Sequence, residues 1–260
     1  MEKNRKKRGI LEKAVFFAVI LVIWQLLYVL GTGVFDVWKS YAMPSPVGVW
    51  QTFLRLIGDG SLVWAAANSL LRGFLGYFIA VILGTGIGLL MNHFDYLCRN
   101  LRPLVTGIQT LPSICWVPFS ILWFGLTEQA ILFVVVMGSV FSMAIAVDNA
   151  IRNVPPLYKK AALTMGADKK QLYRKVILPA SLPELIAGLK QGWSFAWRAL
   201  MSGEVMTTCI GLGQTLITGR NLADIDQVML VMIVIVLTGI LIDQIVFRAL
   251  ERWVYRKRGM

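Results

Sequence analysis

Long apolar runs, separated by shorter polar and basic stretches, recur along the whole chain. A helix needs about 20 apolar residues to cross the hydrocarbon core of a bilayer. The first run follows a cluster of basic residues and could be a signal peptide, but no Ala-x-Ala cleavage motif follows Leu30, which favours a retained helix. The pattern predicts an all-α integral membrane protein with six transmembrane helices, over residues 14–30, 70–91, 103–124, 130–147, 185–206 and 228–247.

Lys and Arg are distributed unequally between the segments that connect these runs. If the N-terminus lies in the cytoplasm, the inner segments and the two termini, including Arg258, carry twenty of them. The outer segments carry only Lys39, Arg55 and Arg220. The positive-inside rule therefore places both termini in the cytoplasm, which agrees with an even number of spans. The predicted location is the bacterial plasma (inner) membrane, crossed several times.

Three connecting segments carry local signals of their own. Met43-Pro44-Ser45-Pro46 cannot be regular helix, because each proline disfavours helix at the residue before it. Residues 47–57 follow with apolar side chains at helical spacing, which predicts an amphipathic helix on the outer surface. Residues 148–183 form a long basic inner segment, and residues 207–227 form an outer loop.

Composition supports a membrane protein over a soluble one. Hydrophobic residues make up 57% and charged residues 15% of the chain, against about 45–50% and about 25% in soluble domains. The net charge of +12 would suggest a nucleic-acid partner for a soluble protein. Here the basic residues lie between apolar runs, so membrane topology explains the charge and no nucleic-acid partner is expected. Residues 1–260 are expected to form one transmembrane domain.

The basic inner segment predicts two short helices joined by a turn. Proline suits the first turn of a helix, glycine its end, and aspartate the cap of the next helix. The helices are predicted over residues 157–165 and 169–176, with boundaries at Pro155-Pro156, Gly166, Asp168 and Pro179. Ala161 and Ala162 would let a partner surface approach closely, which suggests a docking site. An ordinary basic loop against lipid headgroups is the alternative.

Part of this segment resembles the signature of a known family. Ala161-Ala162, then Gly166, then Val176-Ile177-Leu178-Pro179 resemble the "EAA" motif of bacterial ABC importer permeases of the nitrate/sulfonate/taurine branch. Lys160 stands in place of the leading Glu and Val176 in place of an Ile, so Lys160 is not expected to make that Glu's contacts. In the family this region, here residues 155–180, docks into the ATPase subunit. The resemblance implies that the ATPase-coupling residues are Lys160, Ala161, Ala162, Gly166, Ala167, Asp168, Leu178 and Pro179.

Two further stretches resemble the same branch. One is Met43-Pro44-Ser45-Pro46, and the other is Leu111-Pro112 followed by Trp116-Val117-Pro118 and Leu122-Trp123-Phe124-Gly125. The resemblance implies the type I ABC importer permease (MetI-like) fold. It also implies two ABC ATPase subunits that bind ATP and Mg, a second permease copy in a homodimer, and an extracytoplasmic substrate-binding protein. The implied substrate is a sulfonate, taurine, nitrate or similar anion, or alternatively a thiamine or riboflavin precursor.

The sequence indicates no cofactor or catalytic site on this chain. A phosphate-binding Gly-x-x-x-x-Gly-Lys-Ser/Thr stretch is missing, and Gly84-Thr85-Gly86-Ile87-Gly88 lies mid-span without a lysine. Its Gly-x-x-x-Gly spacing favours close helix packing instead. One histidine, His93, and three scattered cysteines make no metal-ligand set. The chain is therefore expected to be a non-catalytic subunit, with ATP hydrolysis on a separate subunit.

The fifth apolar run is the most polar of the six. Several of its polar residues share one arc of the helix with Glu184 and Gly188, and polar residues inside a span are functional candidates. The residues predicted to line a translocation path are Gln191, Ser194, Arg198, Ser202 and Glu204. Arg198 would attract an anionic substrate. The alternative is that Arg198 pairs with Glu204 and only holds helices together.

Other residues in the spans have simpler predicted roles. Lys190 and Arg72 are expected to reach out to the headgroups at opposite ends of their helices. Asp243 is expected near the headgroups or paired with a basic neighbour. Trp193 and Trp197 are interpreted as packing or lipid-facing residues rather than a binding site.

Two rival classes remain at the level of the sequence. An ATP-independent secondary transporter predicts broken helices in two corresponding halves, but the Pro112 and Pro118 pair has no counterpart elsewhere. An integral-membrane enzyme would need clustered His, Asp or Cys residues near one face, which the sequence lacks.

Overall fold

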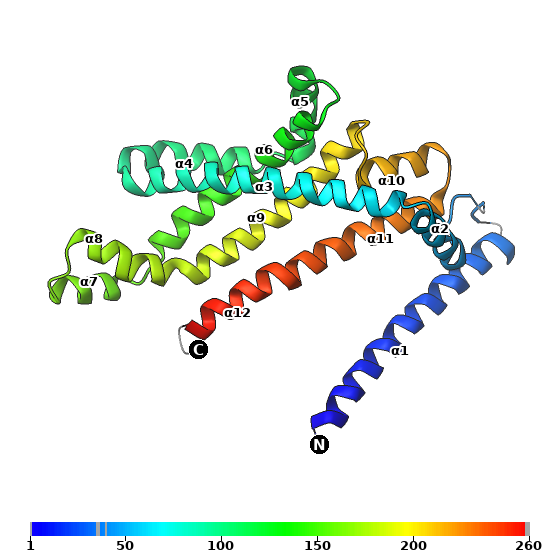
Figure 1. Ribbon diagram of the computed structural model, residues 1–260, viewed down its shortest axis with the longest axis horizontal. Helices are drawn as coiled ribbons and strands as arrows, with labels where there is room; N and C mark the ends of the chain where they lie inside the picture. The colour runs from blue at the N-terminus through cyan, green and yellow to red at the C-terminus, as the bar shows by residue number, and fades with distance from the viewer. Residues whose placement is uncertain (1, 35–36, 40, 258–260) are drawn as a thin grey trace. The chain divides into compact units, whose positions relative to one another are not determined.

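Every regular element in the described part of the chain is a helix (Figure 1), which confirms the predicted all-α class. The computed structural model describes residues 2–34, 37–39 and 41–257, so Arg258 of the basic tail lies outside the described residues. The α-helices are α1 (Glu2–Val29), α2 (Pro46–Gly58), α3 (Ser61–His93), α4 (Asp95–Gln109), α5 (Val117–Phe124), α6 (Glu128–Arg152), α7 (Pro156–Thr164), α8 (Lys169–Gln171), α9 (Leu178–Met206), α10 (Leu212–Asn221), α11 (Ile225–Ile242) and α12 (Arg248–Lys257). Shorter segments are the π-helical η1 (Leu30–Val34), η3 (Leu172–Ile177) and η4 (Asp243–Phe247), and the 3₁₀-helical η2 (Ser113–Trp116).

Four helical stretches of the described chain are long and apolar enough to cross a membrane: Val15–Gly33, Ser61–His93, Glu128–Arg152 and Ile225–Arg252. They cover the first, second, fourth and sixth predicted spans. A fifth would be the bent pair Asp95–Gln109 and Ser113–Phe124. Helix α9 covers the remaining predicted span but carries four charged residues and is not among these stretches. The count of six and the cytoplasmic termini stay predictions.

The chain divides into two compact units, Met1–Trp64 with Thr215–Val234 and Ala65–Gln214 with Ile235–Met260. In the first unit, α2 is the predicted amphipathic helix. The Ser45 hydroxyl oxygen accepts a hydrogen bond from the Gly48 amide at 2.9 Å, and the Ser45 amide donates to an Asp226 carboxylate oxygen at 2.8 Å. The proline-flanked serine therefore begins the helix and ties it to the start of α11.

The core of the second unit is the contact between α6 and α9, which lie side by side (Figure 1). Small residues let the two backbones approach, because a side chain at each glycine would collide with the facing helix. The facing pairs are Gly188 with Ala146, Gly192 with Met143, Gly138 with Ala199, and Gly203 with Ile131. Trp193 and Trp197 of α9 are buried and stack on each other at 5.9 Å between ring centroids, so they are packing residues as predicted.

Helix α3 packs on α6 through the glycines of its central stretch. An added Cβ at Gly84 would lie 2.7 Å from the Val140 carbonyl oxygen, and one at Gly88 would lie 2.6 Å from the Ala144 carbonyl oxygen. Gly86 between them has nothing within 4 Å. The predicted Gly-x-x-x-Gly packing role is therefore confirmed for Gly84 and Gly88.

The predicted span over residues 103–124 is not a straight helix, because the chain bends by 98° between Asp95–Gln109 and Ser113–Phe124. Pro112 adopts extended backbone angles (φ −56°, ψ 138°) and cannot donate a helical hydrogen bond. Leu111, which precedes it, is pushed away from helix by the same ring. Pro118 then lies in the first turn of α5, a position that tolerates proline.

The sequence suggested that Pro179 ends the helix that starts at Lys169, and this prediction is wrong. The helix continues through the π-helical η3 into α9. In the wider π turn the Leu178 amide donates to the Tyr173 carbonyl, five residues back. The wider turn accommodates the proline ring at the start of α9, where a missing amide is tolerated. The second helix of the coupling segment and the polar helix α9 are therefore one continuous helical rod, from Lys169 to Met206.

Gly88→Ala is expected to lower the free energy of unfolding by about 1–3 kcal/mol, because the new Cβ overpacks the contact with α6. Gly86→Ala is the matched control on the same helix and should change it by less than about 0.5 kcal/mol. Unfolding of the detergent-solubilised variants measures the difference. Equal destabilisation of both variants would contradict the close approach of α3 and α6.

Candidate functional site

The polar stripe predicted on α9 lies on the face that does not pack against α6. Gln191, Ser194 and Arg198 are exposed, and Ser202 is half-buried. Gly188 belongs instead to the buried face, against Ala146. Because small residues hold the opposite face of α9 on α6, the described chain leaves these polar side chains uncovered.

Arg198 has no acidic partner among the described residues. Its Nε donates to the Ser194 carbonyl at 3.1 Å, one helical turn back, and its guanidinium carbon lies 4.7 Å from the Phe195 ring centroid. These contacts hold the base of the side chain and leave guanidinium donors available. A cation–π contact of this kind orients the guanidinium without neutralising its charge.

A cavity of about 280 Å³ lies between Arg198 and the bend of the chain after α4. Its lining includes Gln109, Thr110 and Ser113, and the Ser113 hydroxyl lies 3.3 Å from that of Ser202. The sequence analysis missed these three residues, because their position depends on the bend turning them towards α9. The Leu111-Pro112 pair was the available signal, since it marks a probable helix break.

Glu204 belongs to a different site from Arg198, so the predicted alternative pairing of the two is wrong. Glu204 is fully buried, and its carboxylate lies between Arg72 and Ser69. The Arg72 Nη1 lies 2.9 Å from Oε1, and the Ser69 hydroxyl lies 2.7 Å from Oε2. The Gly213 amide donates to Oε2 at 3.0 Å. The carboxylate is therefore fully occupied inside the chain.

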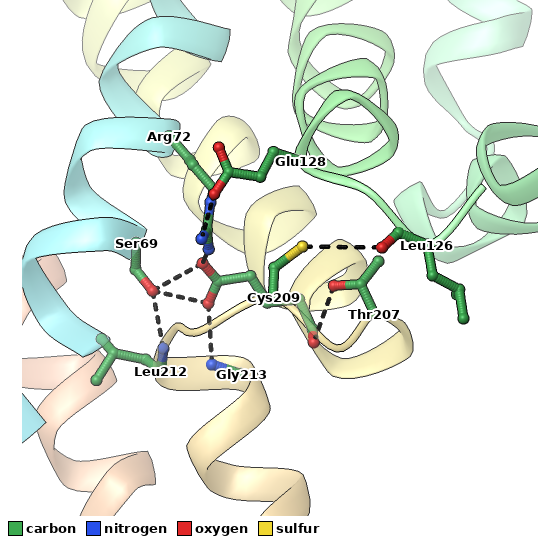
Figure 2. A network of polar contacts seen from close by, with 9 residues as sticks. Ser69, Arg72, Leu126, Glu128, Thr207, Cys209, Leu212 and Gly213 are labelled. Atoms are coloured by element: carbon green, nitrogen blue, oxygen red, sulfur yellow. Dashed lines mark hydrogen bonds and ion pairs between the residues drawn. The ribbon is translucent and has the colours of Figure 1, made fainter. Parts of the chain in front are cut away.

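Arg72 does not reach out to the membrane surface as predicted. It is 4% exposed, and its Nη2 lies 3.0 Å from an oxygen of Glu128, whose side chain is 63% exposed. The Ser69 hydroxyl also accepts a hydrogen bond from the Leu212 amide at 2.8 Å (Figure 2). A buried charge needs such complete pairing to be tolerated. The network joins α3, the start of α6, the end of α9 and the start of α10.

Charged pairs also lie near the opposite end of these helices. Asp148 of α6 is fully buried and pairs with Arg152 at 2.7 Å and Arg102 at 3.3 Å. Lys190 Nζ lies 3.1 Å from an Asp243 oxygen, which confirms the predicted basic partner of Asp243. Among the described residues, Arg72, Arg152 and Lys190 of α3, α6 and α9 are each matched with an acid, whereas Arg198 of α9 is not.

The predicted turn between the two short helices is confirmed. Gly166 has a φ of +79°, which suits glycine after a helix, and the Asp168 carboxylate accepts a hydrogen bond from the Gln171 amide at 2.6 Å. Lys160 and Ala161 are exposed. Ala162 is buried within the chain, whereas it was expected to face a partner.

The remaining surface of this segment is apolar as well as basic. Leu157, Tyr158 and Met165 are exposed on α7 and the turn that follows it, and Leu178 and Pro179 are exposed further along, while Ala167 is half-buried. Exposed apolar side chains of this density mark an interaction surface.

The class of protein that these features define is a membrane transport subunit. The features are helices of membrane-spanning length, an uncovered polar stripe beside a helix break, and an exposed two-helix segment. Within the described residues, no three His, Cys, Asp or Glu side chains come close enough to hold a metal ion. Residues 76–256 match the family described as the binding-protein-dependent transport system inner membrane component, and the chain belongs to this family. The resemblance to ABC importer permeases is thereby confirmed.

Named relatives are similar along nearly the whole chain. SsuC of Bacillus subtilis, a permease whose name assigns it to aliphatic sulfonates transport, is 31% identical over 256 residues, which are 98% of this chain and 91% of SsuC. NrtB of Leptolyngbya laminosa, a nitrate import permease, is 29% identical over 242 residues, 90% of this chain and 84% of NrtB. CmpB of Synechococcus elongatus, a bicarbonate transport system permease, is 27% identical over 265 residues, 97% of this chain and 92% of CmpB.

A solved structure shares the fold. A chain of the MetNI methionine ABC transporter, in an inward-facing conformation, superposes with a TM-score of 0.57 and 25% sequence identity. The match covers 73% of this chain and 96% of that chain. The expected MetI-like architecture is confirmed to this extent.

Glu204→Gln is expected to lower the free energy of unfolding by about 3–5 kcal/mol, because it leaves the buried Arg72 without its buried counter-ion. Glu128→Gln removes a charge from the same Arg72 at an exposed position and should cost about 1 kcal/mol or less. Thermal unfolding in detergent compares the two. If the exposed variant were the more damaging, the buried pair would not be the main contact of Arg72.

Proposed function

We propose that the chain, as a homodimer, forms the translocation path of an ATP-driven importer for a small oxyanion. The observation that carries the proposal is Arg198, an exposed cation that lies beside a polar cavity and has no acidic partner in the described part of the chain. The relatives named above are assigned to sulfonates, nitrate and bicarbonate, and all three solutes are small oxyanions. A guanidinium offers paired donors that match such oxygens.

The setting of Arg198 strengthens its attraction for an anion. The effective dielectric constant inside a membrane protein is lower than in water, so a charge there acts more strongly and over a longer distance. Thr110 and Ser113 add neutral hydroxyl groups to the lining of the cavity, which can hydrogen-bond a solute without reversing the positive charge. Such a site would attract an anion and still let it leave, as transport requires.

In the proposed topology both termini are cytoplasmic and the chain crosses the bacterial inner membrane six times. The assignment of each connecting segment to the inner or the outer face follows from the positive-inside bias of the sequence. Helix α9 is too polar to face lipid on all sides, so its stripe of Gln191, Ser194 and Arg198 would face a water-filled path between the two copies. The bent α4–α5 pair would count as one crossing with its break beside that path.

The proposed partners act on the two faces of the membrane. An extracytoplasmic binding protein would deliver the solute, and two ATPase subunits would bind ATP and Mg, because this chain has no phosphate-binding loop. The exposed apolar side chains of Leu157, Tyr158 and Met165 would dock on the ATPase. Closure of the ATPase pair would push this segment, and the continuous helix from Lys169 to Met206 would carry the movement to the stripe.

Arg198→Ala is expected to reduce uptake about 10- to 100-fold, because a charge-assisted hydrogen bond to the solute is lost. The measurement is uptake into proteoliposomes that contain the permease, its ATPase and its binding protein. The solute panel is taurine, an alkanesulfonate, nitrate and bicarbonate. Arg220→Ala, which removes an exposed cation from α10, is the matched control and should transport normally. Normal uptake of all solutes by Arg198→Ala, with intact assembly, would remove Arg198 from the path.

Ala161→Trp is expected to uncouple ATP hydrolysis from uptake severalfold while thermal stability is unchanged, because Ala161 is exposed on the docking helix. Ala162→Trp should instead lower the free energy of unfolding by about 1–3 kcal/mol, because Ala162 is buried. ATP hydrolysed per solute imported is measured for both variants, together with their melting temperatures. Unchanged coupling in Ala161→Trp would show that α7 does not dock the ATPase.

A further inference from the structure

A second and larger cavity, of about 630 Å³, lies where the coupling segment meets the ends of two membrane-length helices. Its size falls within the range of about 300–1,000 Å³ that is typical of ligand sites. Its lining residues come from α3, α6 and the rod that runs from α8 through η3 into α9: Leu89, Asn92, His93, Ile151, Lys169, Lys170, Tyr173, Arg174, Ile177, Leu178 and Ser181.

The lining divides into an apolar part and a basic part. Leu89, Ile151, Ile177 and Leu178 supply aliphatic surface, and Leu89 and Leu178 are each about half exposed, at 49% and 54%. Lys169, Lys170 and Arg174 supply three positive charges, and none of the described residues that line the cavity is acidic. An apolar floor beside unopposed cations fits an amphipathic anion.

The depth of the cavity along the helices suggests which amphipathic anion binds. His93 is the last residue of the membrane-length stretch Ser61–His93, and Ile151 lies next to the end of Glu128–Arg152. In the proposed topology, the ends of these two stretches lie towards the headgroups of one leaflet. Tyr173, half exposed in the same wall, is a residue type enriched at that level.

We propose that this cavity binds one anionic phospholipid of the adjoining leaflet. Lys169, Lys170 and Arg174 would hold the phosphate, with Arg174 able to contact two of its oxygens at once. The acyl chains would lie on Leu89, Ile177 and Leu178. Basic pockets between transmembrane helices at the cytoplasmic side are known to suit such headgroups. This site is separate from the translocation path and does not depend on the identity of the imported solute.

The bound lipid would connect two parts of the subunit. One wall of the cavity is α8–η3, which directly follows the docking helix α7, and the opposite wall is the end of α3. A lipid held by both walls would brace the coupling segment against the membrane-spanning part. Removing anionic lipid would then loosen the segment that receives the movement of the ATPase.

The test measures lipid retained by the purified permease–ATPase complex, using native mass spectrometry. The probes are phosphatidylglycerol and phosphatidylcholine added at equal concentration. The wild-type complex should keep phosphatidylglycerol preferentially. Arg174→Gln should weaken this retention about fivefold, the loss expected for one cation near a lipid phosphate. Lys175→Gln is the matched control, because Lys175 is the adjacent exposed cation but does not line the cavity, and it should retain lipid normally.

A filling variant separates the cavity from general attraction to a basic surface. Asn92→Trp keeps every charge and occupies the cavity, so it should also lose phosphatidylglycerol. Equal retention of the two lipids, equal effects of Arg174→Gln and Lys175→Gln, or full retention by a folded Asn92→Trp would each overturn the proposal. Retention by the isolated permease but not by the complex would also overturn it, since the ATPase would then cover the cavity.

Discussion

The close approach of α6 and α9 is the contact on which the rest of the site depends. Glycine and alanine at the facing positions, such as Gly188 against Ala146 and Gly138 against Ala199, bring the helices together without interlocking side chains. One face of α9 is thereby used for packing, and the polar residues on the other face cannot be covered by the same contact. A side chain as large as leucine at Gly188 would push α9 away and turn the stripe with Arg198 out of place.

The buried carboxylates of Glu204 and Asp148 are tolerated because each pairs with an arginine. Three polar donor atoms surround the Glu204 carboxylate, the Arg72 Nη1, the Ser69 Oγ and the Gly213 amide nitrogen, so both of its oxygens are hydrogen-bonded. Gly213 is close enough to the carboxylate that a side chain there would meet the Glu204 Cβ. The network holds the end of α9 to α3, and Arg198, about one and a half turns earlier on the same helix, has no acidic partner among the residues described. The positive charge proposed to attract a solute is therefore free because Glu204 is already paired with Arg72.

The sequence predicted those features that depend on neighbouring residues alone. Gly166 and Asp168 determine a turn and a cap through local backbone chemistry, and both have the expected geometry. The features that depend on tertiary partners were not predictable in this way. The helix continues through Pro179 because the wider π turn before it accommodates the proline ring. The helix breaks at Pro112, where the chain has no such turn. The sequence suggested Arg198 as the partner of Glu204, because both lie on one helix and Arg72 was expected at the headgroups, whereas the fold pairs Glu204 with Arg72 of α3.

The continuous rod from α8 to α9 explains how one helix can serve both the docking segment and the path. At about 1.5 Å per residue, the helix from Lys169 to Arg198 spans roughly 40 Å, which is comparable with the thickness of a bilayer. A helix transmits displacement along its axis because its hydrogen bonds resist changes in length. In the proposed cycle, a push on α7 that passes the turn at Gly166 would therefore displace the whole rod. It must move α9 relative to α6 or be resisted by the buried network at the far end. The small residues between α6 and α9 favour the first outcome, since smooth helix surfaces slide more readily than interlocked ones. Axial sliding would carry Glu204 together with Arg198, so the exposure of Arg198 could change only if the contact between Glu204 and Arg72 were also strained.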